Sequence, residues 1–266
     1  MPVTATVLLL LGSTVVAGEH RGARADDGVD DSADDAAADG AAADAADDGA
    51  AVVGVVKFDG PRPERKPVQL TGKSADLAEC HKLLKKAPLA ENLIVGEEGE
   101  LANVFVYVKR GLEKKSYPAP EEPAVIDQEM CMFRPRVLGV QLGQEFAMKN
   151  SDPLIHNVRS FSTRNRAFNI AQPAGSADRK KVFTVQERAI RIKCDFHPWM
   201  EAFVFAMEHP YFAVTDEKGH FRIEGLPAGE YTLAAWHEEF DEQKVTITVG
   251  ATGSAKVDFS FEPEPE

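Results

Sequence analysis

The feature that most constrains the fold of this sequence is a succession of short apolar segments after Ala51, most of them bounded by Gly, Pro or Asn. They include "AVVGVVKFDG", "LANVFVYVK", "EPAVID", "RVLGVQLG", "EFAMKN", "KVFTV", "RAIRIKC" and "EAFVFAME". Segments of this length that are rich in Val, Ile and Phe are typical of β-strands, and turns at short intervals favour an antiparallel sandwich. We therefore expect an all-β fold, a Greek-key β-sandwich.

One segment departs from this pattern and predicts a helix. In "SADLAECHKLLKK", residues 74–86, the apolar positions Leu77, Cys80 and Leu84 recur at helical spacing. We expect a short helix inserted between strands.

The first fifty residues have a different character. Residues 1–25 contain an apolar stretch from Val3 to Ala17, followed by small residues, and resemble a secretory signal, although no Lys or Arg precedes the stretch. A buried helix is the alternative, and an export signal of this kind is either cleaved or kept as a membrane anchor. Residues 26–50 hold ten aspartates among Ala and Gly, which predicts a disordered acidic linker. We expect an exported, periplasmic or cell-surface protein.

Charge excludes one class of partner. The formal net charge is −13, and most of it comes from the acidic linker, so the remainder of the chain is close to neutral. Nucleic-acid-binding domains carry a basic patch or stripe, and none is recognisable here. We therefore expect no nucleic acid partner, and contact with a membrane only through the N-terminal segment.

The C-terminal residues 210–262 have their own pattern of turns. "DEKG" and "LPAG" are turn signals between alternating segments in "FAVTDEKGHFRIEGLPAGEYTLAAWHEE". This region resembles the carboxypeptidase regulatory-like repeat, which implies a small β-sandwich that usually carries out no chemistry. The early strand Val52–Phe58 is a candidate to complete its sheet, in which case the two units would share one body.

A candidate metal site lies in "IKCDFHPWMEAFVF", residues 192–205. Cys194, His197 and Met200 fall in a short loop between two predicted strands, and a thiolate, an imidazole and a thioether form a soft ligand set that suits copper. A second imidazole is available from His156 in "KNSDPLIHNVRSF". Zinc is the leading alternative, but it makes little use of methionine.

These two loops resemble the copper loops of amicyanin, a member of the cupredoxin family, and the similarity extends over residues 136–208. It implies a copper domain, placed at residues 51–209, with one type 1 copper held by His156, Cys194, His197 and, weakly, Met200. It also implies that Asn157 ties the two loops together. Phe196 stands where the amicyanin loop has proline, so an additional N–H toward the sulfur would raise the reduction potential.

The resemblance implies a blue copper protein that carries single electrons, as in methylamine-utilisation-like exported proteins. Its partner would be a redox protein such as a c-type cytochrome or a dehydrogenase. Electrons would enter at the edge of His197 through an apolar patch that comprises Pro153, Leu154, Pro198 and Trp199. Core packing is the alternative role of Trp199. A copper-storage protein and a β-sandwich interaction module without redox activity are the alternative functions. No catalytic constellation is visible, so we do not expect an enzyme.

The remaining cysteines and histidines have less certain roles. Cys80 and Cys131 predict a disulfide that pins the inserted helix, with a second metal site as the alternative because His81, Met130 and Met132 are adjacent. The other histidines are scattered and are expected to be structural or exposed: His20, His81, His209, His220 and His237.

Overall fold

The computed structural model describes residues 50–71 and 75–263. The expected signal segment and nearly all of the expected acidic linker lie outside these residues. Within them, no helix has the length and apolar character needed to cross a membrane.

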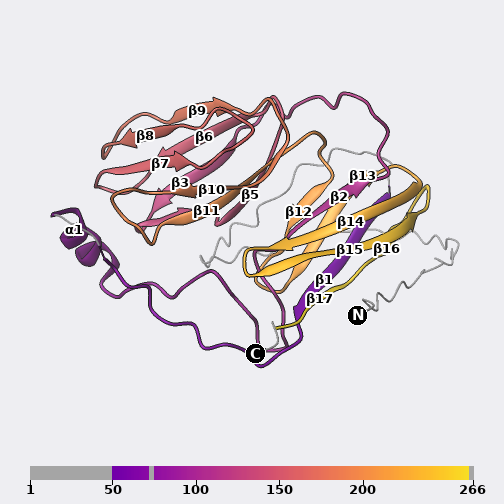
Figure 1. The fold of residues 1–266 in the computed structure, drawn as a ribbon, viewed down its shortest axis with the longest axis horizontal. Helices are drawn as coiled ribbons and strands as arrows, with labels where there is room; N and C mark the ends of the chain where they lie inside the picture. The colour runs from indigo at the N-terminus through magenta and orange to yellow at the C-terminus, as the bar shows by residue number, and fades with distance from the viewer. Residues whose placement is uncertain (1–49, 72–74, 264–266) are drawn as a thin grey trace, which may run out of the picture.

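Four β-sheets make up the described part of the chain, so the predicted all-β class is confirmed (Figure 1). Two of the sheets contain the C-terminal strands. One has the order β13-β1-β16, with β17 also paired to β1, and the other has the order β12-β2-β14-β15. Their strands are β1 (Ala50–Phe58), β2 (Phe105–Arg110), β12 (Phe212–Val214), β13 (His220–Leu226), β14 (Gly229–His237), β15 (Phe240–Val249), β16 (Ser254–Lys256) and β17 (Phe259–Phe261).

The other two sheets form the sandwich that carries the metal-ligand candidates. Their orders are β5-β11-β10-β7-β8 and β4-β3-β6-β9. The strands are β3 (Ala124–Glu129), β4 (Met132–Arg134), β5 (Val137–Gln141), β6 (Glu145–Asn150), β7 (His156–Ser160), β8 (Asn169–Gln172), β9 (Arg179–Val182), β10 (Glu187–Lys193) and β11 (Glu201–Met207). The pairs β3–β6 and β5–β11 are parallel, which requires the chain to cross over between its pairings.

Early strands complete the C-terminal sandwich. β1 pairs antiparallel with β13, and β2 lies between β12 and β14. The strand expected to join this sheet therefore does so, and β2 joins it as well. The limits expected for the two domains, 51–209 and 210–262, stay a prediction.

Three apolar clusters hold the four sheets together. One fills the C-terminal sandwich and a second fills the sandwich with the metal-ligand candidates. The third joins the two sandwiches and includes Phe105 and Phe205, whose stacked rings have centroids 3.9 Å apart. The first four residues of β2 and all but the first residue of β11 are apolar, because side chains alternate along a strand and both faces of these segments are covered.

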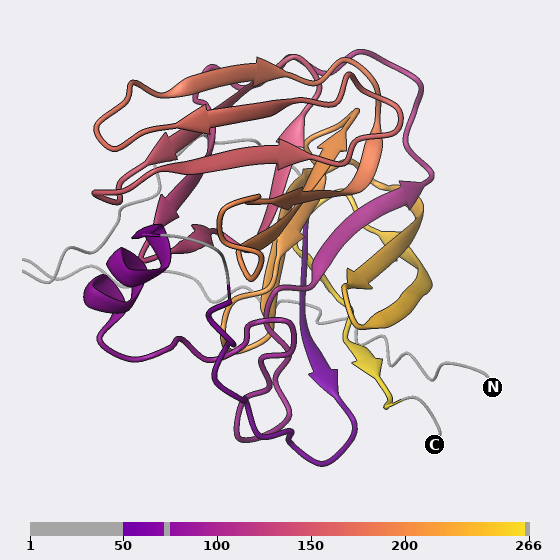
Figure 2. The ribbon, with the colours of Figure 1, turned by 60° about the vertical axis from the view of Figure 1, so that its left-hand side comes forward.

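The predicted helix is α1, Ala75–Leu84. It lies beside the sandwich that carries the metal-ligand candidates, although β1 and β2, which precede and follow it in the chain, belong to the C-terminal sandwich (Figures 1 and 2). Leu83 and Leu84 pack against the core of that sandwich, and a disulfide joins Cys80 to Cys131. The excursion from β1 to β2 thus brings α1 to the metal-ligand candidates.

Strand limits differ from the sequence pattern at "KVFTV", where a strand was expected. β9 ends at Val182, whose side chain is exposed, whereas Phe183 turns into the core. β9 is the edge strand of its sheet.

Candidate metal centre

The loop of residues 194–200 connects two neighbouring antiparallel strands. β10 ends at Lys193, which pairs with Glu201 at the start of β11. Two hydrogen bonds fold the loop between them: the Met200 N–H donates to the His197 carbonyl (2.8 Å), and the Cys194 N–H donates to the Met200 carbonyl (3.3 Å). The short span therefore holds both Cys194 and His197 against the core.

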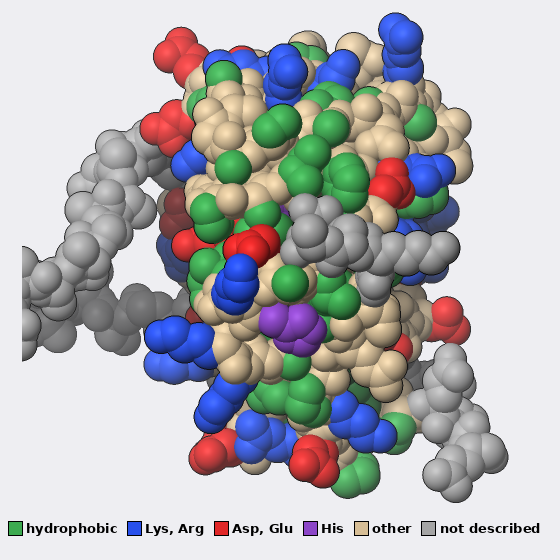
Figure 3. All heavy atoms as spheres, turned by 90° about the vertical axis from the view of Figure 1, so that its left-hand side faces the viewer, with side chains coloured by type: hydrophobic (Ala, Val, Ile, Leu, Met, Phe, Trp, Pro, Cys, Tyr) green, Lys and Arg blue, Asp and Glu red, His purple; other side chains and the backbone are tan. Residues whose placement is uncertain are grey.

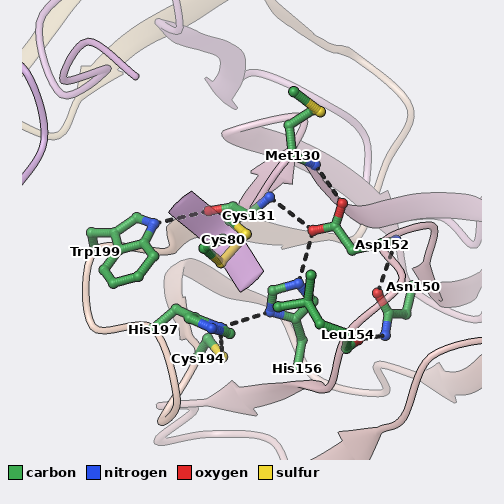
Figure 4. Close-up of a disulfide and its surroundings, with 10 residues drawn as sticks. All are labelled: Cys80, Met130, Cys131, Asn150, Asp152, Leu154, His156, Cys194, His197 and Trp199. Carbon is green, nitrogen blue, oxygen red and sulfur yellow. Dashed lines mark hydrogen bonds and ion pairs between the residues drawn. A yellow bond between two sulfur atoms is a disulfide. The ribbon is translucent and has the colours of Figure 1, made fainter. Parts of the chain in front are cut away.

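His156 reaches the same point from a neighbouring strand. It is the first residue of β7, which pairs with β10. His156 Nδ1 lies 2.8 Å from His197 Nδ1, and Cys194 Sγ lies 3.6 Å from His197 Nδ1 (Figure 4). His156 and His197 are fully buried and Cys194 is 2% exposed. Three donors from two distant segments thus converge in a dry environment.

These distances fit a single ion. Metal–nitrogen bonds of about 2.0 Å and metal–sulfur bonds of about 2.3 Å allow one ion to reach atoms separated by up to twice those lengths. One donor atom from each of the three residues can be chosen so that all three atoms lie within 4.8 Å of one another. Two imidazole nitrogens at 2.8 Å also repel each other unless a proton or a cation lies between them.

Asp152 fixes the tautomer of His156. Asp152 Oδ2 lies 2.8 Å from His156 Nε2, and both side chains are buried. A carboxylate accepts hydrogen bonds, so Nε2 carries the proton and Nδ1 is left with a lone pair toward Cys194 and His197. Sequence reasoning did not identify Asp152, although a carboxylate four residues before a candidate ligand in the same loop was a usable signal.

Asn157 connects the two loops. Its Oδ1 accepts hydrogen bonds from the Asp195 N–H (2.7 Å) and from Cys194 Sγ (3.3 Å). Its Nδ2 donates to Asn169 Oδ1 and to Asp195 Oδ2. The structure therefore gives this side chain contacts with the cysteine loop, and a place next to His156 in β7.

The cysteine is a free thiol. Burial raises the pKa of Cys194, so without a cation the group stays protonated. A bound cation would have to displace that proton, as metal binding to cysteine generally does.

Met200 ends the same loop and is fully buried in the core cluster that also contains Cys194. The structure thus keeps it in the interior, in the same core cluster as Cys194. Phe196, in contrast, is 38% exposed.

A second group of donors, Cys131, Asp152 and His156, lies equally close together but is no metal site of its own. The Cys80–Cys131 disulfide, with its sulfur atoms bonded at 2.03 Å, removes the thiolate. The expectation of a disulfide therefore corresponds to the structure, and Cys80 and Cys131 do not form a second soft-ligand cluster.

The apolar patch is only partly at the surface. Pro153 and Pro198 are exposed, Trp199 is half-buried and Leu154 is buried. The edge of His197 is covered, since this residue has no exposed surface. On the side of the molecule where α1 lies, apolar side chains gather in the middle and Lys and Arg lie mostly toward the margins (Figure 3).

Among the residues that the structure describes, His156 and His197 are the histidines of the donor cluster. His81 and His220 are exposed, and His20 is outside the described residues. His209 and His237 are buried, and burial lowers the pKa of each to about 4, with Arg136 adding to the effect at His237. Both are therefore neutral structural side chains near pH 7.

Comparison with protein families identifies one part of the chain. The model of the carboxypeptidase regulatory-like domain matches residues 200–262, so this similarity begins at β11 and includes all the C-terminal strands. No curated protein matches the chain in sequence.

Among solved structures, the chain is similar to cupredoxins at low TM-scores. A purple cupredoxin from Nitrosopumilus maritimus has 22% identity and a TM-score of 0.27, over 31% of this chain and 98% of that protein. A copper(I) form of mutant amicyanin has 15% identity and a TM-score of 0.28, over 38% and 97%. The copper-containing nitrite reductase of Thermus scotoductus SA-01 has 16% identity and a TM-score of 0.31, over 38% of this chain but only 26% of the reductase.

Proposed function

We propose that this chain is an exported type 1 copper protein that carries single electrons between redox partners. The supporting observation is the convergence of three buried donors, with the two histidine Nδ1 atoms 2.8 Å apart and the cysteine sulfur 3.6 Å from one of them. Met200 would be the fourth, weak ligand.

The donor set favours copper over zinc. One thiolate and two imidazoles, with a thioether from the same loop, match the blue-copper ligand set, whereas structural zinc sites use four thiolate or imidazole ligands. Bound copper would supply reversible one-electron chemistry.

The surrounding residues suit a carrier because they hold the donors still. Asp152 fixes the His156 ring, and Asn157 links Cys194 to the strand that carries His156. Complete burial of both imidazoles excludes water from the site. A site whose ligands are already oriented needs little rearrangement when its charge changes, and this favours outer-sphere electron transfer.

The docking face would lie beside the loop of residues 194–200. Pro153, Phe196 and Pro198 are exposed there, and an apolar surface of this kind suits transient binding of a redox protein such as a c-type cytochrome or a dehydrogenase. Because the His197 ring is covered, electrons would cross the short layer of side chains over it. Export is supported by the signal-like residues 1–25, and the carboxypeptidase regulatory-like region would serve as a structural or interaction unit.

The test is a titration of the full-length mature protein with Cu²⁺, followed by visible and electron paramagnetic resonance spectroscopy. The matched control is Cys194→Ser, which preserves the size of the side chain but removes the sulfur. We expect an intense blue or purple charge-transfer band with a narrow copper hyperfine splitting in the wild type, and neither in the control.

Reversible voltammetry of the loaded protein separates a carrier from a storage protein. A stable one-electron couple supports the carrier. Copper that binds through Cys194 but cannot be cycled would select the storage function, and absence of Cys194-dependent binding would select a β-sandwich interaction module.

A further inference from the structure

The disulfide-bearing turn between β3 and β4 contacts both candidate metal loops. Met130 and Cys131 form this turn, and both have left-handed backbone conformations, with φ of 53° and 51°. Residues with a Cβ atom rarely adopt such angles unless their surroundings hold them there. The contacts that hold this turn therefore indicate what its conformation is used for.

The first contact is with the loop before His156. The Asp152 carboxylate accepts the N–H of Met130 (2.7 Å) on Oδ1 and the N–H of Cys131 (2.8 Å) on Oδ2. The same Oδ2 is the atom 2.8 Å from His156 Nε2 (Figure 4). The turn thus sets the carboxylate that orients the first histidine.

The second contact is with the loop that carries His197. The indole Nε1 of Trp199 donates a hydrogen bond of 3.0 Å to the carbonyl of Cys131. The Trp199 ring packs on the His197 ring, with centroids 5.1 Å apart. One intermediate side chain therefore connects the turn to each histidine, Asp152 in one loop and Trp199 in the other.

The disulfide is the remaining restraint on the turn. It ties Cys131 to Cys80 of α1, 51 positions earlier in the chain, and both cysteines are fully buried. Their burial places the covalent link inside the same core cluster as Cys194 and Met200. Without the link, α1 would be held to this sandwich mainly by Leu83 and Leu84.

We propose that the Met130–Cys131 turn, fixed by the disulfide to Cys80, positions both candidate metal-binding histidines, so that tight copper binding depends on an intact disulfide. This inference rests on the proposed copper function. Its physical basis is that side chains that orient metal ligands commonly change affinity by about 10- to 100-fold when they are removed.

The experiment compares the full-length mature protein with the double variant Cys80→Ser/Cys131→Ser, since a single substitution would leave a free thiol beside His156. We expect the Kd for copper to rise at least about tenfold, with a changed charge-transfer band. Trp199→Phe keeps an aromatic ring but lacks the indole donor and should give a smaller change in the same direction. The matched control is Val125→Thr, a substitution of similar size at an exposed position of β3 outside the turn, and its Kd should stay close to that of the wild type.

A metal-free measurement keeps this inference distinct from the copper function. Hydrogen exchange at the indole N–H of Trp199 and at the backbone amides of positions 130 and 131 should become faster in the double variant. Unchanged exchange together with an unchanged Kd would overturn the inference. If the double variant does not fold, the Kd and the backbone amide exchange of Trp199→Phe are judged in the same way. Faster exchange in a protein whose wild type binds no copper would refute the copper function and leave the positioning of the two histidines supported.

Discussion

Replacing Asn157 with leucine tests whether this side chain staples the two loops of the candidate metal centre. Asn157→Leu preserves the approximate size of the side chain but removes every hydrogen bond that it makes. The largest loss is the acceptor for the Asp195 N–H, which lies 2.7 Å from Asn157 Oδ1 in a partly buried position. Leaving such a donor without a partner costs about 1–3 kcal/mol.

The other bonds add less. The thiol of Cys194 is a weak donor, and water can replace the donations to Asn169 and Asp195, because both partners are exposed. The substitution should therefore lower the free energy of unfolding by about 3 kcal/mol in total. For a chain of this size this loss corresponds to a fall in Tm of roughly 6–12 °C. The affinity for copper should fall by about 10- to 100-fold, because a group that orients a ligand has been removed.

Differential scanning calorimetry of the metal-free protein measures the fall in Tm, and competition with a chelator of known affinity measures the change in copper affinity. Asn169→Ala is the matched control, since it removes one partner of Asn157 and the Asn169 bond to Asp195 Oδ2, but leaves the bonds of Asn157 itself to Asp195 and Cys194 in place. Its effect should stay below about 1 kcal/mol. A leucine variant whose Tm and copper affinity both stay within error of the wild type would refute the stapling role.

Two further predictions concern the buried ion pair of Arg136 with Glu238 and the buried histidines. Arg136 and Glu238 form a bidentate pair at 2.5 and 2.6 Å, and both side chains are 8% exposed. Arg136→Met should therefore lower the free energy of unfolding, measured in urea titrations, by about 3–5 kcal/mol. Adding Glu238→Gln should restore part of that loss, and an Arg136→Met variant as stable as the wild type would contradict the prediction. The lowered pKa values of His209 and His237, about 4 each, mean that the unfolded chain binds more protons between pH 6.5 and 4, so stability should fall as pH decreases through that window, by up to about 3 kcal/mol for each histidine. A pH titration of Tm checks this, and His209→Phe/His237→Phe should flatten the curve there.

Much of the fold follows from local sequence patterns. The strands β1, β2, β10 and β11 lie where short segments rich in apolar residues predict them, and α1 lies where the spacing of Leu77, Cys80 and Leu84 predicts a helix. β4, β7 and β8 could not be located in this way. Each is only three to five residues long, too short for a pattern of side-chain alternation to be distinguished from a turn.

The sequence predicts the candidate ligands and Asn157, but it does not predict the other residues that support them. Cys194, His197 and Met200 share one loop between two predicted strands, and together with His156, found as a second imidazole, they predict a site. Asp152 and the Met130–Cys131 turn take part through hydrogen bonds between segments about twenty residues apart. Such contacts depend on how strands align across a sheet, and no spacing in the sequence specifies them.

The junction between the two sandwiches and the donor cluster lie on opposite faces of one sheet. The apolar junction uses one face of β2 and one face of β11, whereas the donor cluster lies on the opposite face of the sheet that contains β11. β11 therefore connects the two regions directly: Phe205 and Met207 face the C-terminal sandwich, and Ala202 and Val204 face the core that holds the donors. A rigid strand with both faces packed resists bending. Packing of the C-terminal sandwich can thus stiffen the strand that begins where the candidate metal loop ends.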